Sequence, residues 1–173
     1  MGYIVDLQVA RLTMINHVDY LVTRKWKGVI LLCSQSNWGN RDVINDWHIK
    51  RGFDEIGYHF VITNPYNDYE AWKDNKPDMR ISGSDGSIEI GRSLNDSGAH
   101  AKGFNRDYIG ICFIGDNFFT PTQLRAGIGL IEGLMTRFKI KRENVLGHCD
   151  LPNTGKTCPN FNHQECIIEY LDQ

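Results

Sequence analysis

The chain of 173 residues has a mass of 19.8 kDa, which is the size of one ordinary domain and cramped for two. Apolar residues make up 41% of it and charged residues 23%, so a packed core is expected and extensive disorder is excluded. The 19 basic and 21 acidic residues leave a net charge of −2, which gives no electrostatic footprint for duplex nucleic acid.

Membrane spans, secretory signals and disulfide scaffolds each have a sequence signature, and the chain matches none of them. The longest apolar run, residues 29–33, is far shorter than the roughly 20 residues of a membrane span. Residues 1–6 show neither the basic nor the apolar region of a secretory signal, so we expect a cytoplasmic chain. The 5 cysteines include no CxxC pair, which favours free thiols in a reducing compartment.

The first third of the chain predicts a helix, a strand and a second helix. Apolar residues recur at every third position within residues 1–27, which indicates a leading helix. Residues 29–33 predict a buried strand. Asn40 or Asp42 then caps a helix that runs to about Arg51.

The middle of the chain predicts three strands and one polar stretch. Residues 58–63 alternate and are rich in β-branched and aromatic side chains, which is typical of a strand. Residues 64–86 are polar and rich in turn residues, so we expect an extended hairpin or an insertion there. A short strand at residues 87–92 and a strong central strand at residues 108–115 follow.

The last third predicts two helices on either side of a short strand. Thr120, Pro121 and Gln123 match a helix start with a capping box, and apolar residues follow at helical spacing. Residues 145–148 predict a short strand, and residues 162–171 predict a closing helix. Strands that alternate with helices predict a single α/β domain with a central mixed β-sheet flanked by helices.

The loop after the predicted strand at residues 145–148 holds the strongest candidate chemistry. His148 and Cys158 offer an imidazole and a thiolate, which are both zinc ligands, and the loop is short enough to bring them onto one ion. The alternative is a structural loop with a spare cysteine. Lys156 would lower the pKa of the nearby thiol or stabilise an oxyanion beside a metal. Trp38 is a weaker candidate for lining a sugar or peptide groove.

Six short motifs follow one another along the chain: Gly57-Tyr58-His59-Phe60, residues 85–92, residues 99–105, residues 109–112, Gly147-His148 and Lys156-Thr157-Cys158-Pro159. Their order and spacing resemble the type 2 N-acetylmuramoyl-L-alanine amidases, a family that includes phage endolysins and the peptidoglycan recognition proteins. The resemblance spans about residues 28–171. It divides the chain into an N-terminal extension at residues 1–27 and an amidase-like domain at residues 28–173, with an insertion at about residues 64–84.

The resemblance implies an enzyme that uses a zinc ion to cleave the amide between N-acetylmuramic acid and L-alanine in peptidoglycan. His148 and Cys158 match two zinc-ligand positions of the family. Tyr58 matches the residue that assists the attacking water as a base or hydrogen-bond partner, and Lys156 matches the cation that steadies the oxyanion. His59 and His100 are expected either to line the substrate groove or to be structural.

One ligand position departs from the family pattern. The family's remaining histidine ends the first strand, and here that position holds Leu32, followed by Cys33. Leucine coordinates nothing, and strand alternation is expected to point Cys33 to the opposite face unless a bulge or register slip intervenes. If about 10–16 kcal/mol of zinc binding is shared by four ligands, losing one costs about 3 kcal/mol, or roughly a hundred-fold in affinity. We therefore expect weak or absent zinc and impaired hydrolysis.

Three functions fit these residues. The first is a peptidoglycan amidase, either an endolysin that reaches the wall after release or a recycling enzyme that meets soluble muropeptides. The second is a non-catalytic wall-binding module, and the third is a regulatory module that binds a protein partner. We expect a monomer with no nucleic-acid or membrane partner, and we expect the aromatic-bearing insertion at residues 64–84 to border the substrate groove.

Overall fold

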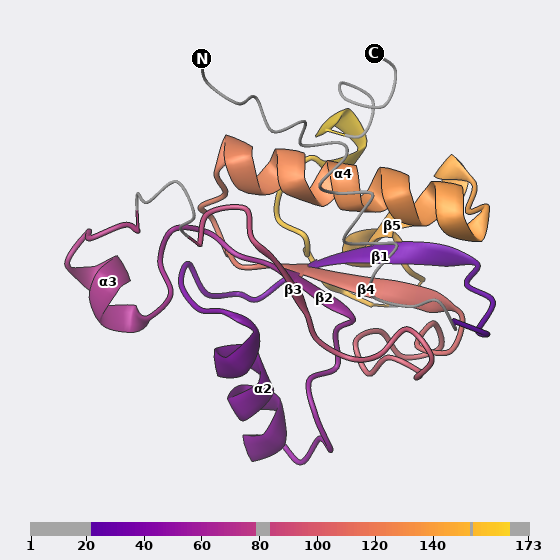
Figure 1. The fold of residues 1–173 in the computed structure, drawn as a ribbon, viewed down its shortest axis with the longest axis horizontal. Coiled ribbons are helices and arrows are strands. Elements are labelled where there is room, and N and C mark those ends of the chain that lie inside the picture. The colour runs from indigo at the N-terminus through magenta and orange to yellow at the C-terminus, as the bar shows by residue number, and fades with distance from the viewer. Residues whose placement is uncertain (1–21, 79–83, 153, 167–173) are drawn as a thin grey trace, which may run out of the picture.

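The computed structural model describes residues 22–78, 84–152 and 154–166 (Figure 1). Most of the predicted leading helix lies outside these described residues. Its last part, residues 22–27, has no regular secondary structure, although Trp26 is buried in the core. None of the helices in the described part of the chain is both long enough and apolar enough to cross a membrane.

A five-stranded sheet in the order β3-β2-β4-β1-β5 forms the centre of the molecule. Its strands are β1 (Gly28–Cys33), β2 (Phe60–Ile62), β3 (Ile88–Ile90), β4 (Tyr108–Phe113) and β5 (Val145–Gly147). Neighbouring strands are parallel except for β2 and β3, which are antiparallel. The predicted single α/β domain with a mixed sheet is therefore confirmed, although the strands predicted at residues 58–63 and 87–92 are shorter than expected.

Helices cover the sheet on both faces, which explains why β1 is buried along its whole length (Figure 1). The long helix α4 (Pro121–Phe138) lies across one face, where Leu31 belongs to the main core cluster. Helix α2 (Arg41–Lys50) lies on the other side of the sheet. Because strand residues alternate, Leu32 belongs to a separate cluster on the face away from α4.

The helix starts follow the predicted capping chemistry. The Asn40 side chain accepts hydrogen bonds from the first turn of α2, and Thr120 accepts one from the backbone of Gln123 at the start of α4. The Gln123 side chain does not complete a capping box. It is fully buried, and its Nε2 donates to the carbonyls of Ile62 and Ile114 at 2.9 Å and 2.8 Å. This amide therefore ties the first turn of α4 to β2 and to the end of β4.

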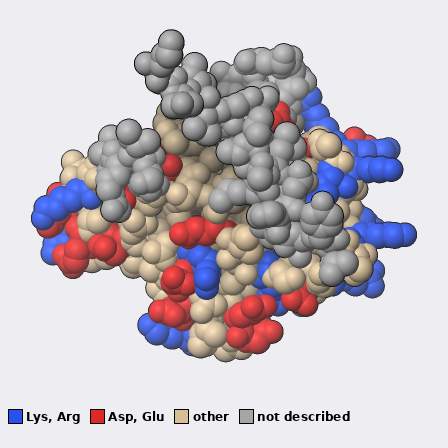
Figure 2. Space-filling view, viewed as in Figure 1, with Lys and Arg blue, Asp and Glu red and all other residues tan. Residues whose placement is uncertain are grey.

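Short elements complete the described chain. The stretch between the antiparallel strands β2 and β3 contains the helix α3 (Tyr69–Lys73), capped by Asp68, which the prediction of an extended hairpin missed. Two 3₁₀ turns, η1 (Arg142–Asn144) and η2 (His148–Asp150), flank β5. Residues 163–166 are helical, as predicted, and the rest of that predicted helix lies outside the described residues. Basic and acidic side chains are both present on the face shown in Figure 2.

Candidate active site

The candidate site lies where the parallel strands β1 and β5 end. Because the two strands are parallel neighbours, their carboxyl ends meet at one edge of the sheet, which is where α/β folds commonly bind ligands. Cys33 is the last residue of β1, and His148 follows β5 directly. The loop after η2 then returns, since the backbone N–H of Cys149 donates to the carbonyl of Cys158 at 2.9 Å. The fold thus brings distant parts of the chain to one edge.

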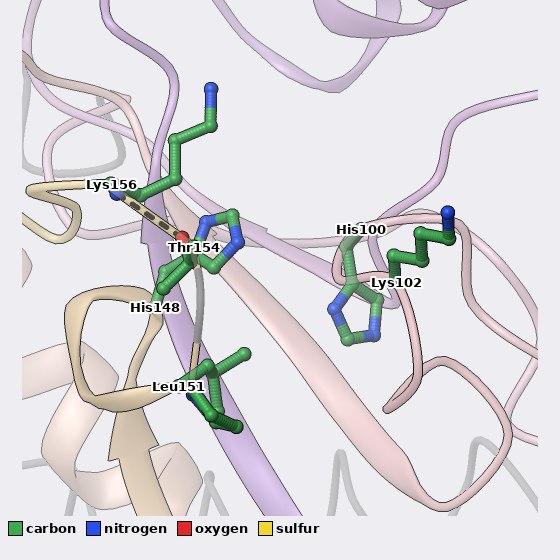
Figure 3. A pocket seen from close by; sticks show the side chains of 7 residues that line it. His100, Lys102, His148, Leu151, Thr154 and Lys156 are labelled. Carbon is green, nitrogen blue, oxygen red and sulfur yellow. Dashed lines mark hydrogen bonds between the residues drawn. The ribbon is translucent and has the colours of Figure 1, made fainter.

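A pocket of about 470 Å³ opens at this edge (Figure 3). Seven residues line it: His100, Lys102, His148, Leu151, Pro152, Thr154 and Lys156. His148, Thr154 and Lys156 lie close together on one side, and His100 and Lys102 lie across from them (Figure 3). No acidic side chain of the described chain lines this pocket, so it suits an anionic or strongly polar ligand.

Cys158 lies beside Cys33, which corrects one prediction. The two Sγ atoms are 3.3 Å apart, and the Cys33 thiol donates to Cys158. Strand alternation was expected to carry Cys33 away from this site, and that expectation is wrong. The loop runs from one face of the sheet to the other. It starts at Leu151, which packs with Leu32, and reaches Phe161, which packs against the core under α4. It therefore crosses the end of β1, where the last side chain of the strand can meet it.

The hydrogen bond between the two thiols also shifts their acidities. It lowers the pKa of Cys158, and a hydrogen bond from His148 lowers it further. The same thiol–thiol bond, together with burial, raises the pKa of Cys33. The pair therefore favours a thiolate at Cys158 and a thiol at Cys33.

Leu32 occupies the expected ligand position as a core residue. It is 2% exposed and packs with Ile30, Ala101 and Leu151, and the ring of Tyr58 packs against this cluster. Leu151 also lines the pocket, so Leu32 belongs to the apolar layer directly beneath it. Leu32 therefore offers no donor atom at the position where the resemblance predicts the family's third ligand.

The residues present do not fit a complete zinc site at His148 and Cys158. In the described chain, one group of three donor side chains has all its ligand atoms within 4.8 Å of one another, and it consists of Cys149, Asp150 and His163. This group excludes both predicted ligands. Within it, Asp150 Oδ2 lies 2.8 Å from His163 Nε2 and accepts from the N–H of Gly147 at 2.7 Å. These hydrogen-bond contacts hold the turn after β5 and account for the group without a metal ion.

Tyr58 lies near the thiols of Cys158 and Cys33 and outside the pocket lining. It is half-buried and packs against the apolar clusters that contain Leu32 and Cys112. Burial raises the pKa of the Tyr58 hydroxyl well above its ordinary value, and the nearby thiols of Cys112, Cys158 and Cys33 raise it further. Its hydroxyl therefore stays protonated at neutral pH and is suited to donating a hydrogen bond.

The two predicted groove histidines occupy different layers. His100 lines the pocket, and its Nε2 lies 3.1 Å from the carbonyl of Tyr108. His59 lies behind it and is fully buried, and its Nδ1 accepts from the N–H of Gly110 at 2.9 Å. Burial lowers the pKa of His59 to about 4 and that of His100 to about 3, so both rings are neutral at pH 7.

Trp38 lies in an aromatic group outside the pocket lining. Its ring packs edge-on against Trp47 at 5.3 Å and against Tyr69 at 5.8 Å between centroids. Tyr69 belongs to α3, so the predicted insertion contacts the residue that was predicted to line a groove. The pocket residue Lys102 was not singled out from the sequence, although it lies within a quoted motif. In that motif Asn105 accepts the N–H groups of His100 and Ala101 at 2.8 Å and 2.7 Å.

Comparison with known proteins identifies the class. Residues 18–161 match the N-acetylmuramoyl-L-alanine amidase family model, so the chain belongs to this family. The endolysin of Enterobacteria phage T3 is 31% identical over 135 residues, which cover 73% of this chain and 72% of that protein.

Solved structures show the same fold. The endolysin amidase LysCS from Clostridium intestinale URNW is 26% identical and superposes with a TM-score of 0.67. The match covers 86% of this chain and 85% of that one. Human PGRP-IβC in complex with glycosamyl muramyl pentapeptide is 22% identical, with a TM-score of 0.59 over 86% of this chain and 85% of that one. The predicted amidase and peptidoglycan-recognition fold is confirmed.

Proposed function

We propose that the chain binds peptidoglycan or its muropeptides at the pocket beside β1 and β5, and that it hydrolyses the N-acetylmuramoyl-L-alanine amide with greatly reduced efficiency. The family match and the phage endolysin relatives support an amidase scaffold. The human relative of the same fold is solved with a muramyl pentapeptide, which supports a muropeptide as the ligand class.

One observation carries the proposal of impaired hydrolysis. Leu32 stands where the family places a ligand, and it is buried in an apolar cluster beneath the pocket. Two predicted donors, His148 and Cys158, then remain for zinc. Cys33 touches Cys158, but among the described residues these two thiols and His148 do not form a group whose ligand atoms all lie within 4.8 Å of one another. Since a catalytic zinc ion needs three protein ligands and one open position for water, a two-donor site holds the ion weakly.

The remaining residues keep a chemistry suited to recognising an amide. Lys156 lines the pocket beside His148, and a cation there stabilises the charge that develops on a carbonyl oxygen. Tyr58, protonated because of its burial, supplies a hydrogen bond. Lys102 lies across the pocket from His148 and Lys156 and suits a carboxylate of the stem peptide. The Lys102 contact supports binding even where hydrolysis is lost.

A non-catalytic wall-binding module is the second candidate, and the same apolar packing of Leu32 favours it. In that case the pocket serves recognition alone, and a histidine at residue 32 would restore no activity. The two candidates differ in the response of one variant, Leu32→His, with Leu32→Ala as the matched control that removes the leucine without adding a ligand.

The experiment measures wall lysis and wall binding for the three proteins. Turbidity loss of purified cell walls reports hydrolysis, and co-sedimentation with the same walls reports binding. We expect all three to sediment with walls and Leu32→His alone to lyse them rapidly. Binding by all three without lysis by Leu32→His would support the non-catalytic module. Failure of the unsubstituted chain to bind walls or soluble muropeptides would overturn the proposal.

A further inference from the structure

Two free thiols from opposite ends of the chain are held in contact at the sheet edge. Cys33 and Cys158 are 125 positions apart in sequence, yet their Sγ atoms are 3.3 Å apart. Both side chains are buried, at 3% and 5% exposed. The contact was not predicted from the sequence, and the proposed muropeptide binding does not use Cys33.

The backbone on each side of the contact is fixed. Cys33 ends β1, which pairs with β4 on one side and β5 on the other. The carbonyl of Cys158 accepts the N–H of Cys149 at 2.9 Å, which anchors its loop to the turn after β5. The two sulfur atoms are therefore held near each other by the fold, and a disulfide bond of about 2.05 Å needs them to approach by little more than about 1 Å.

The other described cysteines have different surroundings. Cys112 is buried among Ile44, Val61 and Ile114 on the side of the sheet covered by α2. Cys149 is exposed, and its Sγ lies 3.8 Å from a carboxylate oxygen of Asp150. Cys149 therefore provides a control thiol that is close in sequence to the site but is not part of the contact.

We propose that Cys33 and Cys158 are an oxidative modification site, and that a hydroperoxide converts them into a reversible intramolecular disulfide. The bond would take the Cys158 sulfur, a predicted metal ligand, out of the site. This inference goes beyond the proposed function, because it does not depend on whether the chain binds or cleaves peptidoglycan.

The chemistry balances with hydrogen peroxide as the oxidant. The thiolate of one cysteine of the pair attacks one peroxide oxygen, the O–O bond breaks, and a sulfenic acid forms with release of hydroxide. The thiol sulfur of the other cysteine, 3.3 Å away, then attacks the oxidised sulfur, the S–O bond breaks, and the S–S bond forms. The leaving oxygen departs as water with the proton of that second thiol. The two sulfurs are oxidised by two electrons in total, and the peroxide is reduced to hydroxide and water.

The test treats the full chain with dilute hydrogen peroxide and counts thiols by alkylation under denaturing conditions. We expect the intact mass to fall by two hydrogen atoms, three of the 5 thiols to remain, and peptide mapping to join residues 33 and 158. Dithiothreitol should restore all of them. The melting temperature should rise on oxidation, since the bond would close a long loop in the unfolded chain.

Two variants distinguish oxidation of the Cys33–Cys158 pair from oxidation of other cysteines. Cys33→Ser should form no intramolecular disulfide and show no rise in melting temperature, whereas Cys149→Ser should behave like the unsubstituted chain. Peptide mapping of the oxidised, unsubstituted chain shows whether residues 33 and 158 are joined, even if Cys33→Ser folds poorly. The proposal is overturned if all five thiols remain after peroxide treatment, if other cysteines are joined instead, or if oxidation stops at singly oxidised sulfurs.

Discussion

Replacing Leu32 with histidine changes two free energies in opposite directions. Leu32 is 2% exposed within an apolar cluster, so losing its burial costs about 2–3 kcal/mol of unfolding free energy. A histidine ring placed there without a partner adds about 1–3 kcal/mol for its unsatisfied polar atoms. In the presence of a chelator, the variant should therefore be about 3–6 kcal/mol less stable than the unsubstituted chain.

Zinc should reverse much of this loss. A third ligand beside His148 and Cys158 adds about 3 kcal/mol to zinc binding, or roughly a hundred-fold in affinity. An ion that binds only the folded chain stabilises it by about 2.7 kcal/mol at a concentration one hundred times its Kd. The zinc-dependent gain in stability should consequently be much larger for Leu32→His than for the unsubstituted chain.

The assay is urea unfolding at pH 7 under reducing conditions, with excess zinc and with a chelator. Leu32→Ala is the matched control, because it loses the same burial but gains no donor atom. We expect Leu32→Ala to be destabilised equally with and without zinc. Equal stabilisation of all three proteins by zinc would show that histidine at this position adds no ligand. Equal stability of Leu32→His and the unsubstituted chain in chelator would show that Leu32 is not an apolar core residue.

Three further outcomes follow from the structure. Gln123→Ala should lower the unfolding free energy by about 2–4 kcal/mol, measured by urea denaturation, because two buried carbonyls lose their shared donor. Acid should destabilise the fold through His59, whose pKa falls from 6.5 to about 4 on burial. Between these values the unfolded chain binds more protons, so stability falls as the pH drops, by about 2 kcal/mol at pH 5. His59→Gln should reduce the loss of stability at pH 5 by about 2 kcal/mol and leave the loss that comes from His100, whose pKa burial lowers to about 3. In the Leu32→His background, Lys156→Met should lower the rate of wall lysis by about a hundred-fold with little change in wall co-sedimentation, since the cation acts on the oxyanion.

The local pattern of apolar and capping residues was sufficient to predict the main strands and helices of the fold. The five apolar residues at positions 29–33 in β1 are consistent with a strand covered on both faces, and the Thr120–Pro121 start of α4 satisfies its own first turn. The helix α3 was missed because its five residues lie in a polar stretch, where short-range pattern resembles a loop. Its capping residue Asp68 was the available signal.

The site was less predictable because it depends on how loops cross the sheet edge. The pocket residues His148 and Lys156 could be named from one segment, and the structure places them side by side. The contact between Cys33 and Cys158 joins a strand end to a distant loop, so alternation along β1 gave the wrong direction. Lys102 reaches the pocket from a third segment, which no periodicity reveals.

The zinc content of the purified, reduced chain shows directly whether Leu32 leaves the metal site incomplete. After dialysis against a buffer with low free zinc, elemental analysis should find far less than one ion per chain in the unsubstituted protein and close to one in Leu32→His. One tightly held ion per unsubstituted chain, lost on substitution of His148 or Cys158, would contradict the claim that Leu32 leaves the site incomplete.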